Sequence, residues 1–294
     1  MRFLLLFFIV IQGSFLYSQD TIKIHSARRY INLNDYKKLV GKPPESSEFV
    51  FRNGDTLVRI ADDFDPFTSA GFKVKVKYEY KDSTFLSIYK NVVFNLGKKD
   101  SENQRMRYWK DDIKIFFDKS VPNHHANELM DFASKASNGI DSLNISRNFI
   151  RDKANYIVYY LNQENQTDYE PRIANSRGGY YINWNGKQQI YDGKLKINTE
   201  LVETERFQLE LLKYHFIKSL GYFKSSEQLD CESYFSGCRT TRKLTDIDLE
   251  ILKYHYSYGV CKGTDLESFT ELTNSMNKKL EADPNAQLYV VHNE

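Results

Sequence analysis

The stretch Leu211-Leu-Lys-Tyr-His-Phe-Ile-Lys-Ser-Leu-Gly221 decides how this chain is expected to fold. Apolar residues recur in two rows at intervals of three and four residues between Phe207 and Leu220. That spacing is typical of a helix buried on more than one side. Gly221 is a residue type at which helices commonly end. The sequence therefore predicts a long helix around which the chain is organised.

Two segments further along the chain extend this pattern. Ser233-Tyr-Phe235 has the length of a turn, and Leu244 to Tyr256 reads Leu-Thr-Asp-Ile-Asp followed by apolar residues at helical spacing. Together with the Ser-Leu-Gly ending of the first helix, these segments resemble the metzincins, and in particular their matrixin-like branch. In that family the zinc motif HExxHxxGxxH is followed by a methionine turn and a second helix.

The residues that bind zinc and carry out catalysis in that family are replaced here. When Gly221 is set on the motif glycine, the degenerate positions are, in order, Tyr214, His215, Lys218, Lys224 and, in place of the turn methionine, Phe235. Catalytic zinc needs three histidine or carboxylate ligands, and a lysine ammonium has no lone pair to offer. We therefore predict no metal, no cofactor and no catalytic residue at this site.

The resemblance implies an α+β, zincin-like domain. The run from Trp109 to Phe269 is similar to a bacterial secreted family of unknown function whose matrixin-like domains often lack the histidines. Its expected elements follow in the order strand, helix, strand, hairpin and long helix. They are Trp109 to Phe117, Asn127 to Lys135, Ala154 to Leu161, Tyr180 to Trp184 with Gln189 to Ile197, and the helix ending at Gly221. From Glu271 onward we expect a helix and a polar tail.

The amino-terminal region has the sequence patterns of β-strands and turns. Glu48 to Ile60 contains an Asn-Gly pair between two apolar runs, which is a strong hairpin signal. Phe72 to Tyr80 alternates apolar and charged residues as a strand does, and Phe85 to Phe94 is interpreted as further β-structure. The charged segment from 97 to 107 is placed between domains. We therefore predict a signal peptide at 1–19, a β-rich domain at 20–103 and the zincin-like domain at 104–294.

Met1 to Gln19 has one basic residue, Arg2, and a short apolar core, which is typical of a secretory signal peptide. We expect the mature protein to be secreted or periplasmic, with no membrane span. With 41 basic and 39 acidic residues in the whole chain, the charge does not favour nucleic acid as a partner. Export permits disulfides, and Cys231 with Cys238 is the expected pair, although pairing of Cys261 with either remains open.

Adjacent histidines, His124 and His125, follow Pro122 and Asn123. We interpret them as exposed loop residues that bind no metal.

Three functions are compatible with these features. The first is a non-catalytic protein that binds a protein or peptide along the former substrate strand, where Lys218 either holds a carboxylate or extends into solvent. The second is a structural envelope component. The third is a secreted hydrolase with a non-standard site, built from Glu210 and His215 with a partner from the loop between Ser225 and Ser236.

Overall fold

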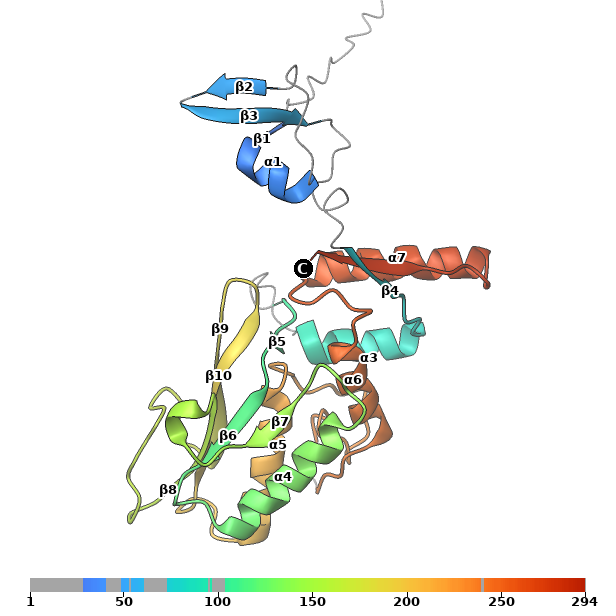
Figure 1. Cartoon of the computed structure of the whole chain (residues 1–294). Coiled ribbons are helices and arrows are strands. Elements are labelled where there is room, and N and C mark those ends of the chain that lie inside the picture. The colour runs from blue at the N-terminus through green and yellow to red at the C-terminus, as the bar shows by residue number, and fades with distance from the viewer. Residues whose placement is uncertain are drawn as a thin grey trace, which may run out of the picture. The chain divides into compact units, whose positions relative to one another are not determined.

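The computed structural model describes residues 29–40, 49–52, 54–60, 73–94, 96, 104–238 and 241–293 (Figure 1). Contacts between residues divide the chain into two compact units, Met1–Lys73 with Asn293–Glu294, and Val74–His292. The predicted signal peptide lies outside the described residues. The expected boundary near residue 103 falls among residues 97–103, which are outside them as well, so it stays a prediction.

The first unit contains a small antiparallel sheet. Its described elements are β1 (Arg29–Asn32), α1 (Leu33–Val40), β2 (Phe49–Arg52) and β3 (Asp55–Ile60). The strand order is β1-β3-β2. The predicted hairpin is confirmed, because β2 pairs with β3 and Gly54 takes φ +85° between them. A glycine adopts that left-handed backbone without steric cost.

The rest of the chain combines a mixed sheet with helices. Its elements are β4 (Lys73–Lys77), α3 (Ser83–Phe94), β5 (Tyr108–Trp109), β6 (Ile113–Phe117), α4 (Asn123–Ser137), β7 (Ile145–Arg147), the short 3₁₀ helix η2 (Arg151–Lys153), β8 (Tyr156–Leu161), β9 (Gly178–Trp184), β10 (Gln189–Asn198), α5 (Glu205–Ser219), α6 (Asp246–Tyr256), α7 (Leu266–Ala282) and β11 (Tyr289–Asn293). The α+β class is thereby confirmed.

The central sheet has six strands in the order β5-β10-β8-β6-β7, with β9 also paired to β10. All of its pairings are parallel except the one between β9 and β10. The predicted hairpin is this β9–β10 pair. β8 lies between β10 and β6 and is buried at five successive residues, as expected of a central parallel strand.

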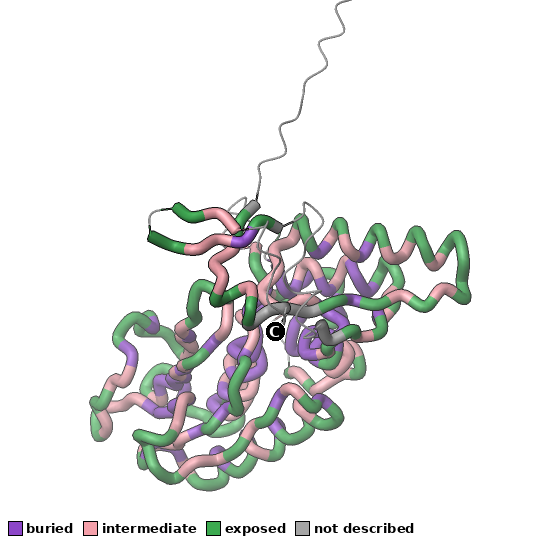
Figure 2. Tube along the Cα trace, turned by 45° about the horizontal axis from the view of Figure 1, so that its top comes forward, coloured by how far each residue is buried: buried purple, intermediate pink, exposed green. Residues whose placement is uncertain are grey.

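The helices α4 and α5 pack on one face of the sheet. Alternate residues of β8, Tyr156, Val158 and Tyr160, belong to the main hydrophobic core on that face. Figure 2 shows buried residues of the described chain in purple. The opposite face holds a buried polar group. Lys196 of β10 donates from its ammonium to Asp168 Oδ2 at 3.2 Å and to the Ile173 carbonyl at 2.9 Å. These bonds fasten the loop between β8 and β9 over the sheet.

The last turn of α5 is held in the core by groups from three other elements. Trp109 of β5 donates its indole N–H to the Ser219 carbonyl at 3.2 Å, and the Tyr256 hydroxyl of α6 donates to the Leu220 carbonyl. The Tyr156 hydroxyl of β8 lies 2.7 Å from Ser219 Oγ. The last carbonyls of a helix have no partner within it, so such bonds are needed where a helix ends in the interior.

The sequence predictions for Phe85 to Phe94 and for the end of the chain are wrong. Phe85 to Phe94 is the helix α3, not β-structure, because its buried residues recur at helical spacing and Asp82 Oδ1 accepts from the Phe85 N–H at 2.8 Å. The chain end is also not a simple polar tail. α7 already begins at Leu266, and the tail ends in β11, which pairs with β4.

Cys231 and Cys238 form the predicted disulfide, and Cys261 is free. A disulfide of this loop length contributes about 2 to 3 kcal/mol in the chain-entropy description. Among the described helices, none has the length and apolarity needed to cross a membrane.

The buried His255 of α6 makes the free energy of unfolding depend on pH. Its ring contacts the Tyr89 hydroxyl at 3.1 Å and the Arg107 carbonyl at 2.9 Å, and burial lowers the pKa of His255 to about 3. The unfolded imidazole has a pKa of about 6.5, so its contribution is complete above that pH and is lost as the pH falls towards 3. We expect the free energy of unfolding to drop by about 2 kcal/mol between pH 7 and pH 5 from this residue alone.

Urea unfolding at the two pH values measures this loss. In His255→Gln, whose amide does not titrate, the decrease should be smaller by about 2 kcal/mol. An equal decrease in both proteins would contradict the assignment.

Candidate binding site on the central helix

The predicted central helix is α5, which is preceded by Thr204 and ends at Ser219. Leu212, Phe216 and Ile217 are fully buried, and α5 contacts α4, β9 and β10. The helix is therefore packed on more than one side, as its sequence predicts. Of the residues at the degenerate positions, His215 lies against Gly178 and Tyr180 of β9.

Lys218 lies in a cluster of cationic and aromatic groups. Its side chain is 6% exposed, its ammonium donates to Ser225 Oγ, and it lies 4.8 Å from the centre of the Tyr214 ring. The Arg242 guanidinium lies 4.3 Å from the centre of the same ring. Two cations therefore share one aromatic ring, a favourable arrangement for each of them singly. We call these four residues, Tyr214, Lys218, Ser225 and Arg242, the cationic cluster.

Burial and the neighbouring charges change the pKa values of Lys218 and Tyr214 within the cationic cluster. Burial lowers the pKa of the Lys218 ammonium; Tyr214 opposes this shift and Arg242 adds to it. Burial acts to raise the pKa of the Tyr214 hydroxyl, but Lys218, Ser225 and Arg242 together outweigh burial and lower it. No carboxylate of a described residue forms an ion pair with Lys218 or Arg242. Of the two alternatives for Lys218, extension into solvent is wrong.

His215 lies beneath the edge strand β9. A Cβ atom at Gly178 would lie 3.2 Å from His215 Cδ2 and 3.3 Å from its Nε2, so the glycine leaves room for the ring. The rings of Tyr180 and Tyr214 flank His215 at 6.2 and 5.1 Å between centroids. Burial, with Lys218 and Arg242 nearby, lowers the pKa of His215 to about 4. The imidazole is therefore neutral at pH 7.

The remaining degenerate positions lie elsewhere. The Lys224 N–H donates to the Val92 carbonyl at 2.7 Å, and its ammonium lies 3.3 Å from the centre of the Tyr222 ring. Phe235 is fully buried, with its ring 5.1 Å from that of Phe223. The structure thus brings together Tyr214, His215 and Lys218, but not the whole predicted set.

Gly221 follows the helix, but not for the reason the sequence suggested. The left-handed residue at this turn is Tyr222, with φ 57°. A Cβ atom at Gly221 would lie 2.3 Å from Phe223 Cζ, because the phenylalanine ring folds back over the glycine. Gly221 is therefore required for close packing.

The segment Ser233-Tyr-Phe235 is fixed by the start of α6. Asp248 is fully buried and accepts from the Ser233 hydroxyl at 2.5 Å and from the Tyr234 N–H at 3.2 Å. The same carboxylate accepts from the Thr245 N–H, and Thr245 caps Asp248 in return. The Thr-x-x-Asp pattern that carried the resemblance therefore has a physical role in holding the turn.

Glu210 and His215 do not form a common site. Five residues along a helix correspond to a rotation of about 140° between side chains. Glu210 lies 3.4 Å from Arg206, and the pKa of Tyr234 is raised by burial and then by Glu210, whereas His215 contacts β9. Glu210 and His215 therefore do not form the pair on which the hydrolase interpretation was built.

Sequence reasoning missed Ser225 and Arg242 as partners of Lys218. Both lie in irregular segments on either side of the disulfide loop, where no periodicity indicates which residues face the helix. The predicted disulfide gave a partial indication, because it closes the loop that separates the segments of Ser225 and Arg242.

The full sequence matches no model of a known protein family, and a search of curated proteins finds no match either.

We expect the substitution Lys218→Met to stabilise the folded protein. The substitution removes a buried charge that has no carboxylate partner among the described residues and keeps the length of the stem. Replacing such a charge by an apolar side chain is often stabilising, and we expect the free energy of unfolding to rise by about 1 kcal/mol.

Lys213→Met on the same helix is the matched control, because the Lys213 ammonium pairs with Glu128 at 3.0 Å. We expect no gain there. Urea unfolding of both variants measures the difference, and a loss of stability in Lys218→Met as large as 1 kcal/mol would refute the unpaired-charge description.

Proposed function

We propose that this chain is an exported, zincin-like protein that carries out no catalysis through α5 and binds an acidic segment of another protein or peptide. The observation that carries the proposal is the cationic cluster, where Lys218 and Arg242 share the Tyr214 ring. Lys218 is buried and Arg242 is half-buried, and neither has a carboxylate partner among the described residues. The desolvation cost of these charges is therefore not offset by an opposite charge. A carboxylate from a partner would compensate it, and the guanidinium of Arg242 suits a bidentate contact with it.

The edge strand β9 supports an extended partner. Its pairing in the described chain is with β10 alone, and its residues Gly178 and Tyr180 lie against His215. A segment added to a sheet edge forms main-chain hydrogen bonds, and side-chain pockets then give specificity. In this arrangement β9 supplies affinity and the cationic cluster selects an acidic side chain.

The zincin-like part of the proposal is supported by the order of the elements. A parallel sheet with one antiparallel edge strand leads into α5, then into the Ser233–Phe235 turn held by Asp248, and then into α6, as the resemblance implies. Export is supported by the disulfide, since such bonds persist in oxidising compartments. A purely structural envelope role would not require a buried lysine beside a half-buried arginine.

Selection from a library of random extended peptides tests the proposal. With the full chain immobilised, we expect enriched sequences to carry Asp or Glu at one fixed position. Lys218→Met should lose this preference at least tenfold, a change of about 1.4 kcal/mol, while Lys213→Met keeps it.

The selection should also survive a chelator, because no metal takes part. Enrichment without an acidic preference, enrichment that Lys218→Met leaves unchanged, or no enrichment at all would each contradict the proposal.

A further inference from the structure

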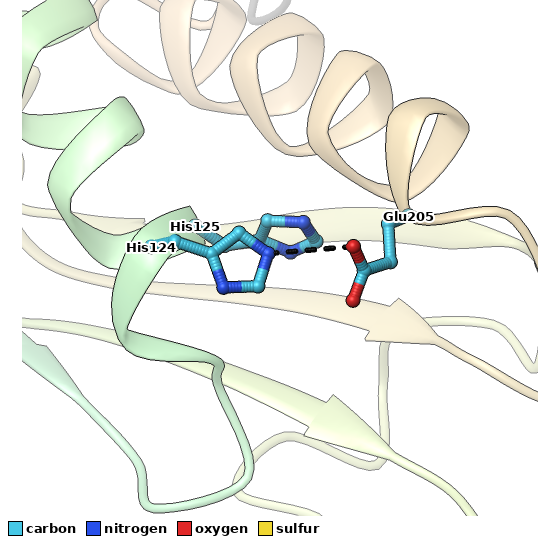
Figure 3. A group of neighbouring side chains, drawn as sticks. All are labelled: His124, His125 and Glu205. Atoms are coloured by element: carbon cyan, nitrogen blue, oxygen red, sulfur yellow. Dashed lines mark ion pairs between the residues drawn. The ribbon is translucent and has the colours of Figure 1, made fainter.

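Two histidines and a glutamate meet where α4 and α5 begin. His124 and His125 stand in the first turn of α4, and Glu205 is the first residue of α5 (Figure 3). One ligand atom from each residue lies within 4.8 Å of the other two. The expectation that both histidines are exposed loop residues is wrong, because they belong to a helix and His125 is 1% exposed.

His125 is held in a fixed orientation. Its Nδ1 lies 2.8 Å from the hydroxyl of Tyr160, a buried residue of the central strand β8. This bond occupies one ring nitrogen, and Nε2 forms no hydrogen bond with another described residue. Histidines that bind metals usually have the second ring nitrogen bonded in this way, which orients the ring and fixes the tautomer.

The other two residues can adjust their positions. The side chains of His124 and Glu205 are 59% and 69% exposed, and His124 Nε2 lies 3.5 Å from Glu205 Oε2. Around zinc, ligand bonds of about 2.0 to 2.1 Å place neighbouring ligand atoms roughly 3.3 Å apart in a tetrahedron. Rotation of these two exposed side chains towards His125 provides the necessary approach.

We propose that His124, His125 and Glu205 bind one divalent transition-metal ion of the zinc type. Two imidazoles and one carboxylate favour such an ion over calcium or magnesium, which prefer oxygen ligands alone. Three protein ligands leave a fourth position for water. The ion ties α4 to α5, and through His125 to Tyr160 of β8. The Lys213–Glu128 ion pair links the same two helices about one turn further along α4 and about two turns further along α5.

This site is distinct from the cationic cluster. Tyr214 follows Glu205 by nine residues, about 13 Å along the helix axis. The alternative to a metal site is a simple ion pair between His124 and Glu205. Both side chains are exposed, so such a pair would contribute little to stability. The two explanations differ in whether added metal binds and in whether His124 and Glu205 are both needed for it.

Zinc chloride titration of the full chain, purified without a polyhistidine tag and stripped with a chelator, tests the proposal. We expect one equivalent of zinc to bind in competition with a chelating dye and to raise the melting temperature. His124→Gln and Glu205→Gln should each weaken binding at least tenfold. Both side chains are exposed, so neither substitution should prevent folding.

Glu203→Gln, an exposed acidic residue two positions before Glu205, is the matched control and should bind zinc as the unmodified chain does. Lys218→Met should also leave zinc affinity unchanged, which separates this site from the cationic cluster. No stoichiometric zinc binding, or equal affinity in His124→Gln and Glu205→Gln, would overturn the proposal.

Discussion

The buried end of α5 is the constraint on which the second unit depends. A helix can end in a hydrophobic core only if other groups bond its last carbonyls. Trp109 and Tyr256 provide these donors for Ser219 and Leu220, and they come from β5 and α6. Sheet, central helix and carboxyl-terminal helices are therefore joined at one buried turn. The position of Lys218, in the same turn, follows from these bonds.

This constraint explains why a cation can persist at Lys218. The ammonium is enclosed beside a turn that is anchored on several sides, and Ser225 and the Tyr214 ring only partly replace its hydration. Arg242 adds a like charge to the same ring. Natural proteins commonly retain such unfavourable groups where function requires them. The cluster is thus better explained by binding an anion than by stabilising the fold.

The sequence predicted those elements whose signals are local. The Asn-Gly hairpin of β2 and β3 and the helix α5 with its buried Leu212 and Phe216 were recognised from spacing and residue type. α3 was misinterpreted because a run rich in apolar and aromatic residues fits a buried strand as well as a buried helix, and the Asp82 cap was overlooked. Pairing of β11 with β4 joins residues far apart in the chain, so no local pattern indicates it.

The candidate sites were predictable to different degrees. Tyr214, His215 and Lys218 lie on one helix, so their proximity follows from helical spacing. Arg242 and Glu205 approach their partners only through the packing of separate elements. His124 and His125 were misplaced because a helix start after Pro122 has the same local signals as a loop.

Anomalous diffraction at the zinc edge, from crystals of the full chain grown with zinc chloride, tests the central claim about α5 most directly. The account predicts no zinc within coordination distance of Tyr214, His215 or Lys218, because a cation is already fixed there. A zinc peak bonded to His215 beside Lys218 would show that α5 retains a metal site, and would contradict the account.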